Sequence, residues 1–125
     1  MQKENIMGAI HVTVNLSYPG TTGDFEKLFL VDTGATDSMA PANELKALGF
    51  KSKGKMTYEL ANGESVEYHY TTADITFMGD TTGGRIIMGP DNAEPILGVT
   101  ALESTGIIVD QANRQLKRLP AIPLK

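Results

Sequence analysis

A turn of sequence Asp-Thr-Gly-Ala, beginning at Asp32, directly follows the apolar run 28–31. An apolar run that stops at turn residues is typical of a buried strand. The turn therefore places the Asp32 carboxylate at the end of a rigid element, where nearby backbone N–H groups can hold its charge. Most Asp residues in such positions only form turns. Here, however, a second short motif of two apolar residues and a glycine, Ile96-Leu97-Gly98, occurs later in the chain and precedes a helix-like segment. The Asp32 turn and this second motif can form a pair of loops.

Alternation of apolar and polar residues predicts a chain made mostly of strands. Residues 10–16 alternate in this way, and a turn cluster at 18–24 returns the chain as residues 25–31, the hairpin partner. After the Asp32 turn we expect a short extended piece at 38–41 and a helix over 43–48 that Gly49 ends. The other expected elements are a long hairpin of 55–60 and 65–77 with a type I′ turn at Asn62-Gly63, a turn over 78–84, a strand over 85–88, a loop over 89–95, a helix over 101–105, and a last hairpin of 107–110 and 115–119.

Composition narrows the functions open to the chain. Its 125 residues are expected to form one domain, residues 1–125. The absence of cysteine excludes disulfides and thiolate nucleophiles, and with only two isolated histidines we expect no metal site and no cofactor. A net charge of −4 without a dense Lys/Arg cluster argues against nucleic-acid binding. No apolar stretch could cross a bilayer and the start lacks a signal-peptide core, so we expect a cytoplasmic protein without membrane contact.

Taken in order, the Asp-Thr-Gly-Ala turn, the hairpin tip at 60–64 and the Ile96-Leu97-Gly98 step resemble the retropepsin-like aspartic proteases. The resemblance covers most of the chain, from Ile10 to Leu119. It implies an all-β, closed and barrel-like acid-protease fold with one or two short helices and a flap hairpin. The chain carries one Asp-Thr-Gly turn where pepsin-like enzymes carry two. The resemblance therefore also implies a homodimer, in which two Asp32 carboxylates face each other across the two-fold axis.

In such enzymes two carboxylates that share one proton hydrolyse peptide bonds with an activated water. The resemblance therefore implies a homodimeric aspartic endopeptidase that acts on peptide or protein substrates. It assigns catalysis to Asp32, to Thr33, whose hydroxyl would reach the other subunit, and to Gly34, whose N–H would support the carboxylate. It assigns substrate binding to the cleft floor, the flap tip and the second loop, at Ala35, Ala61, Asn62, Gly63, Ile96, Leu97 and Gly98.

The chain departs from the retroviral members at Thr36 and Val99, where they carry an Asp and an Arg that help to tie the subunits together. Its flap tip carries Asn62 and Glu64 where viral flaps are richer in glycine and apolar residues, and its C-terminal end is rich in proline. It is therefore more similar to the small bacterial and archaeal retropepsin-like proteins. Two alternatives stay open: a dimeric peptide-binding module of the same fold that cleaves little or nothing, and a structural β-domain whose Asp-Thr-Gly is only a turn. The intact Asp32 favours the enzyme.

Overall fold

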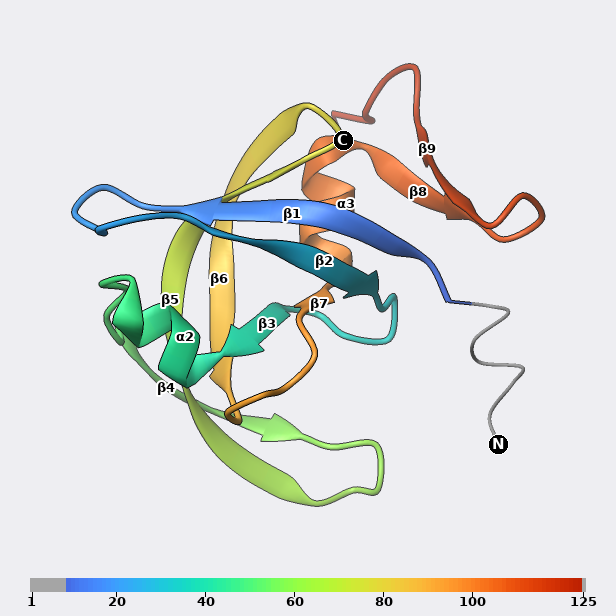
Figure 1. Cartoon of the computed structure of the whole chain (residues 1–125). Coiled ribbons are helices and arrows are strands. Elements are labelled where there is room, and N and C mark those ends of the chain that lie inside the picture. Colours follow the sequence, from blue (N-terminus) through green and yellow to red (C-terminus); the bar gives the residue numbers. More distant parts are fainter. Residues whose placement is uncertain (1–8, 125) are drawn as a thin grey trace.

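The computed structural model of the chain describes residues 9–124. Its elements are β1 (His11–Ser17), β2 (Phe25–Val31), β3 (Ser38–Pro41), α2 (Ala42–Ala47), β4 (Gly54–Glu59), β5 (Ser65–Phe77), β6 (Asp80–Gly89), β7 (Ile96–Leu97), α3 (Val99–Thr105), β8 (Ile107–Asp110) and β9 (Gln115–Arg118). Seven strands form one sheet in the order β1-β2-β7-β3-β6-β5-β4, and β1 also pairs with β5. Six strands therefore close into a ring, with β4 attached outside it to β5 (Figure 1).

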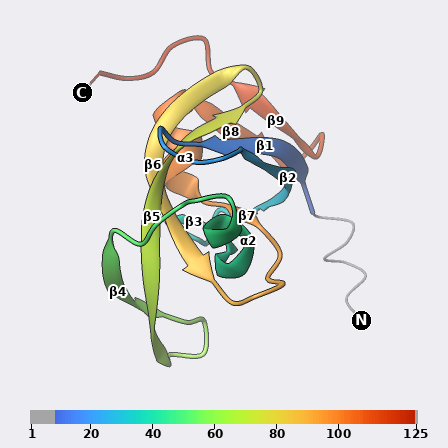
Figure 2. The ribbon, with the colours of Figure 1, turned by 60° about the vertical axis from the view of Figure 1, so that its left-hand side comes forward.

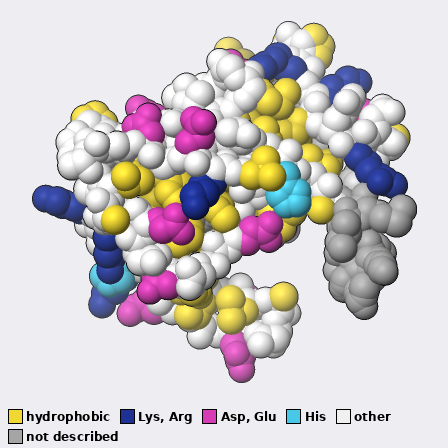
Figure 3. Space-filling model, viewed as in Figure 1, with side chains coloured by type: hydrophobic (Ala, Val, Ile, Leu, Met, Phe, Trp, Pro, Cys, Tyr) yellow, Lys and Arg dark blue, Asp and Glu magenta, His cyan; other side chains and the backbone are white. Residues whose placement is uncertain are grey.

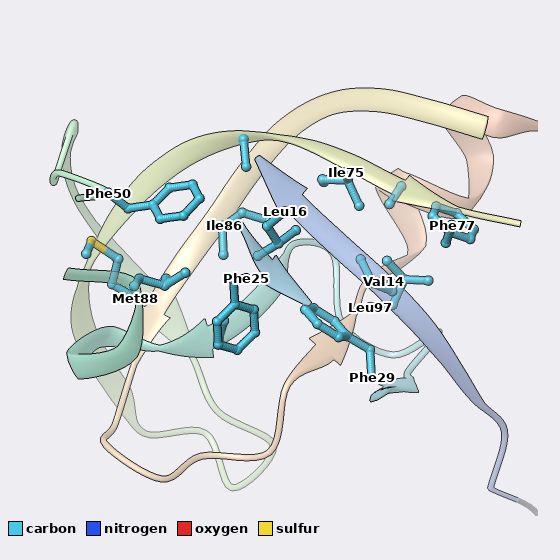
Figure 4. Close-up of a cluster of buried hydrophobic side chains, with 14 of the residues drawn as sticks. Val14, Leu16, Phe25, Phe29, Phe50, Ile75, Phe77, Ile86, Met88 and Leu97 are labelled. Atoms are coloured by element: carbon cyan, nitrogen blue, oxygen red, sulfur yellow. The ribbon is translucent and has the colours of Figure 1, made fainter. Parts of the chain in front are cut away.

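The core is built by strands that send alternate side chains inward. β1 and β2 pair antiparallel, and Val14 and Leu16 on β1 are fully buried, as the alternation predicts. Phe29 on β2 is also fully buried and meets Phe25 edge to face, with 6.1 Å between the ring centroids. Side chains from β3, β5, β6, β7, β8 and both helices also belong to the cluster (Figure 4). The ring is thus held together by packing between segments that lie far apart in the sequence.

The hairpin of β5 and β6 has a shorter turn than the sequence predicts. Met78 and Gly79 connect the two strands, with φ values of 52° and 82°, which is the left-handed pair of a type I′ turn. The ladder begins with Phe77 opposite Asp80, so residues 80–84 belong to β6. The prediction of a turn over 78–84 is wrong, because pairing along the whole length of β5 outweighs the turn preference of the glycines in this segment.

The hairpin of β4 and β5 projects beyond the ring in both ribbon views (Figures 1 and 2). Residues 60–64 form its tip, where the Leu60 N–H donates to the Glu64 carbonyl at 2.7 Å and the Gly63 N–H donates to the Leu60 carbonyl at 2.9 Å. A type I′ turn requires a positive φ at both Asn62 and Gly63. The structure gives one to Gly63 (89°) but not to Asn62, so the predicted turn type is wrong. Asn62 instead uses its side-chain oxygen to accept the Glu64 N–H at 2.9 Å.

The two helices are short, and both end at a glycine in the left-handed region, Gly49 at 99° and Gly106 at 69°. α2 lies within one residue of its predicted span, and α3 begins two residues before the predicted start, at Val99. β8 and β9 form the predicted last hairpin as a separate two-stranded sheet. The all-β fold with two short helices is confirmed. Within residues 9–124 no helix is long and apolar enough to cross a membrane.

Candidate active site

Asp32 lies where β2 leaves the ring. β2 runs parallel to the short strand β7, with Val31 opposite Leu97. The ladder continues past the end of β2, because the Asp32 N–H donates to the Leu97 carbonyl at 3.0 Å. The backbone of Asp32 is therefore fixed by a strand from the second half of the chain, which makes it a rigid support for a functional carboxylate.

The turn that follows holds the Asp32 side chain. The Gly34 N–H donates to one Asp32 carboxylate oxygen at 2.9 Å, and the Ala35 N–H donates to the Asp32 carbonyl at 3.1 Å. A Cβ on Gly34 would lie 3.3 Å from the same carboxylate oxygen. Glycine therefore allows the backbone to approach the carboxylate closely enough for its N–H to donate to it.

The first residues of α3 are hydrogen-bonded to the turn that follows Asp32. The N–H groups of Val99 and Thr100 donate to the carbonyls of Ala35 and Thr36, at 2.8 and 3.1 Å. These N–H groups belong to the first turn of the helix, which leaves them without partners inside the helix. The second loop of the sequence prediction therefore lies directly against the Asp32 turn.

Gly98 and Ser38 lock the two loops together. The Gly98 N–H donates to the buried Ser38 hydroxyl at 2.9 Å. A Cβ on Gly98 would lie 2.6 Å from the Asp37 carbonyl carbon and 2.7 Å from the Thr36 carbonyl oxygen, so only glycine fits without a backbone shift.

A cleft of about 490 Å³ separates the Asp32 turn from the β4–β5 hairpin. In the space-filling view the hairpin stands off the body as a separate lobe (Figure 3). Four of the predicted site residues line the cleft: Asp32, Gly34, Ala35 and Ala61. A volume of this size is ordinary for a ligand site, so the predicted floor and one predicted flap residue share a cavity large enough for a substrate segment.

The other predicted residues lie around this cleft rather than on it. Thr33 is exposed next to Asp32, and Asn62 and Gly63 are exposed at the hairpin tip. Leu97 is fully buried in the core and Gly98 is buried beneath the turn, so within this chain neither offers surface to a substrate. Ile96 is half-buried on β7, next to Leu97.

Sequence reasoning missed most of the cleft wall. The residues concerned are Thr36, Asp37, Met39, Thr57, Tyr58, Glu59, Leu60, Tyr68 and Ile87. One available signal is the position of two tyrosines on opposite strands of the predicted flap; their rings lie 6.3 Å apart. Asp37 has no such signal, because a carboxylate shortly after a turn glycine is typical of an ordinary turn.

Tyr58 has an unusual environment. Its hydroxyl oxygen is buried and has no hydrogen-bond partner among the described residues. Burial raises the pKa of the Tyr58 hydroxyl, the Asp37 carboxylate raises it further, and the Arg85 guanidinium opposes both. Arg85 is thus close enough to act through its charge, although it does not make a well-formed hydrogen bond with the hydroxyl.

A closed ring of strands with an Asp-Thr-Gly turn held by a crossing loop, under a hairpin that covers a cleft, defines a retropepsin-like aspartic protease domain. The comparison with protein families agrees. Residues 20–104 match the family described as "gag-polyprotein putative aspartyl protease". The match spans more than half of the chain, which therefore belongs to this aspartyl protease family, and the resemblance noted in the sequence is confirmed. A search of curated proteins found no match.

Proposed function

We propose that this chain is a homodimeric aspartic endopeptidase in which Asp32 of each subunit supplies one of two catalytic carboxylates. The observation that carries the proposal is the position of Asp32 in the cleft: its backbone is fixed by Leu97, its carboxylate is held by Gly34, and the β4–β5 hairpin lies opposite. The chain contains one Asp-Thr-Gly turn, so one chain provides half of a paired-carboxylate site.

The chemistry requires the pair. Two carboxylates held close together do not both ionise, so they share one proton. The ionised carboxylate takes a proton from water, whose oxygen attacks the carbonyl carbon of the peptide bond. The protonated partner gives its proton to the carbonyl oxygen, which forms a gem-diol. A proton then passes from the gem-diol back to one carboxylate, and the other protonates the amide nitrogen. The C–N bond breaks, which leaves a carboxyl group and an amine.

The β4–β5 hairpin would act as the flap. Main-chain groups along an extended hairpin can pair with an extended peptide, and the apolar wall of the cleft, at Met39, Leu60 and Ile87, would contact its side chains. Closure would exclude bulk water and strengthen the electrostatic effect of the carboxylate pair.

Two observations favour assembly through the face that bears Asp32. The Asp32 turn, the tip of the β4–β5 hairpin and the turn of the β8–β9 hairpin all lie at the right-hand side of Figure 1. Thr33 is exposed there, and no hydrogen bond from its hydroxyl is formed within the described part of the chain. A second copy related by a two-fold axis would bring two such turns together and complete the cleft.

The decisive experiment compares the wild-type chain with Asp32→Asn on a diverse peptide library read by mass spectrometry. Asparagine keeps an oxygen for the Gly34 N–H but cannot act as the base, so cleavage should be abolished while the circular dichroism spectrum stays unchanged. Wild-type cleavage should be blocked by pepstatin. Undiminished cleavage by the purified variant would exclude the assignment, and binding of peptides by the wild type without any cleavage would favour the peptide-binding module.

The pH dependence of the wild-type rate is a second measurement. A shared-proton pair needs one carboxylate ionised and one protonated, so the rate should follow a bell-shaped curve with its maximum on the acidic side. A rate that stays flat from about pH 4 to pH 9 would indicate a different chemistry.

A further inference from the structure

A second cavity, of about 170 Å³, lies at the other end of β2 from Asp32. One wall is the β1–β2 turn at residues 18–20, and the other is the segment 49–53 that joins α2 to β4. This cavity and the Asp32 cleft have no lining residue in common. The whole length of β2 separates them, about 20 Å at the rise of a strand. A ligand in this cavity is therefore remote from the proposed chemistry.

The two walls of the cavity are bonded to each other within the chain. The Leu48 carbonyl accepts hydrogen bonds from the Thr22 N–H at 2.7 Å and from the Thr22 hydroxyl at 3.0 Å. Gly49 has a φ of 99°, and a Cβ there would lie 3.3 Å from the Thr21 Cα, so glycine allows the two segments to pack closely. Because these walls are already held in place, a ligand that binds between them has little chain to order.

The cavity is positively charged, although the chain as a whole has a net charge of −4. Its lining contains Lys51 and Lys53 and, among the described residues, no Asp or Glu. Neither lysine takes part in an ion pair within residues 9–124. Basic side chains are visible at the left-hand edge of Figure 3, the side on which the two walls lie in Figure 1. A concave surface of one charge raises the local concentration of ligands of the opposite charge.

Thr71 gives an independent indication of a ligand. It lines the cavity from β5 and is 1% exposed, and its hydroxyl forms no hydrogen bond within the described part of the chain. The oxygen still has accessible surface, because in residues 9–124 only the Tyr58 hydroxyl is both sealed from solvent and without a partner. A buried hydroxyl without a partner is unfavourable, so a ligand that pairs with it gains affinity.

The Tyr18 hydroxyl also belongs to the cavity. Its oxygen accepts a hydrogen bond from the Lys53 ammonium at 3.2 Å, and the same ammonium lies 4.7 Å from the centre of the tyrosine ring. This hydrogen bond is the main cause that lowers the pKa of Tyr18; the Asp74 carboxylate, which does not line the cavity, opposes it. Since the lysine donates to the oxygen, the hydroxyl proton is left for another acceptor. Two ammonium groups and two hydroxyls thus match a ligand made of acceptors.

We propose that this cavity binds a phosphate group, as the free ion or as the ester of a small molecule, through Lys51, Lys53 and the hydroxyls of Tyr18 and Thr71. A phosphate group carries between one and two negative charges at neutral pH and presents several acceptor oxygens, which matches two lysines and two hydroxyl donors. A carboxylate has one charge and two oxygens, so it satisfies fewer of these groups. The inference does not depend on whether the Asp32 cleft hydrolyses peptides.

Calorimetric titration of the wild-type chain with inorganic phosphate, at neutral pH and low ionic strength, measures the binding directly. Acetate at the same ionic strength is the carboxylate control, and we expect phosphate to bind at least about tenfold more tightly, the size of one charge-assisted hydrogen bond. O-phosphoserine distinguishes the two sources: binding as tight as that of phosphate assigns the site to esters, and weaker binding assigns it to the free ion. No saturable binding of phosphate, or equal binding of acetate, would overturn the inference.

Two variants, each with a matched control, locate the bound phosphate. Lys53→Met removes one charge and should weaken phosphate binding about tenfold, whereas Lys117→Met, at an exposed position on β9, should leave it unchanged. Thr71→Val keeps the side-chain volume and should weaken binding about fivefold, whereas Thr13→Val, at an exposed position on β1, should have no effect. An equal loss in Lys117→Met would show that phosphate responds only to the overall charge, and that result would overturn the proposed site.

A measurement on the wild type removes any dependence on how the variants fold. In amide NMR spectra recorded during the phosphate titration, the signals of residues 18–22, 49–53 and 71 should move along one saturation curve. The signals of residues 32–35, in the Asp32 turn, should not move. Shifts spread evenly over the chain, or confined to other elements, would place phosphate elsewhere and overturn the inference.

Discussion

Gly98 is the residue on which the contact between the two loops of the site depends. It is buried, its N–H is bound by Ser38, and the backbone of residues 36–37 passes directly over it. Packed interiors accept extra atoms only by shifting their neighbours. Here the neighbours are backbone atoms of the segment that joins the Asp32 turn to β3, so a shift would move the turn itself.

Gly98→Ala should therefore lower the free energy of unfolding by about 1–3 kcal/mol and reduce peptide turnover more than the stability loss explains. Gly83→Ala is a matched control, because a Cβ there would meet only an Asp74 oxygen at 3.9 Å. It should leave stability unchanged or slightly raised. Urea unfolding of both variants measures this difference. Equal free energies of unfolding for Gly98→Ala and Gly83→Ala would show that the two loops do not pack as described.

Tyr58 gives a second prediction at this scale. Because its hydroxyl is buried without a partner among the described residues, Tyr58→Phe should raise the free energy of unfolding by roughly 1 kcal/mol. The sign of its pH dependence follows from the raised pKa of Tyr58. Above the ordinary value of 10.0 the unfolded chain loses this proton first, so stability falls as the pH rises further. The variant should lack this part of the fall in urea unfolding at pH 9 to 11, whereas Tyr68→Phe should retain it.

At the residue scale the sequence predicts the groups that belong to a motif and misses those that tertiary pairing delivers. Asp32 and Gly34 follow from the Asp-Thr-Gly turn, because turn geometry brings the glycine N–H to the carboxylate. Asp37 and Tyr58 reach one cleft only after β4 has paired with β5 and β5 with β6. No local pattern encodes that meeting.

At the scale of elements, alternation locates the strands better than turn chemistry locates the turns. The type I′ turn expected at Asn62-Gly63 occurs instead at Met78-Gly79, where a two-residue connection joins two long paired strands. Met at a positive φ is unfavourable by itself, so the pairing of β5 with β6 must compensate for it. The tip of the β4–β5 hairpin is held only by the pairing of β4 with β5. There the preference of Gly63 for a positive φ decides the conformation of the turn.

The flap role of this hairpin can be tested by strain that acts only at its tip. Gly63 has a φ of 89°, and a Cβ at this position would have no other atom within 4 Å, so Gly63→Val should cost about 1–2 kcal/mol through backbone strain alone. Gly20 has a φ of 95° and equally open surroundings in the β1–β2 connection, so Gly20→Val is the matched control. Both variants should lose similar stability, while only Gly63→Val changes peptide turnover. Wild-type kinetics for Gly63→Val would show that the hairpin is not a functional lid.

At the scale of the whole molecule, the closed ring lets one chain enclose its own core and yet provide only half of the proposed enzyme. The six strands of the ring hydrogen-bond to one another, with β1 paired to both β2 and β5, and their inward side chains form the core. The Asp32 turn is not part of the ring of strands, and its Thr33 is exposed. Thr36 and Val99 replace the charged pair that ties retroviral subunits together, and such pairs range from near neutral to several kcal/mol. The proposed dimer would therefore lack this charged pair.

The assembly should thus respond to dilution and to the Thr33 hydroxyl. Specific activity should rise with protein concentration until the dimer saturates. Thr33→Val removes the proposed intersubunit hydrogen bond with little change in volume. Two symmetric bonds of about 1 kcal/mol each would raise the dissociation constant of the dimer roughly tenfold to thirtyfold. Thr13→Val, at an exposed position on β1, is the control and should leave the constant unchanged. Sedimentation across a dilution series measures all three proteins, and a chain that stays monomeric at high concentration while cleaving peptides would contradict the shared site.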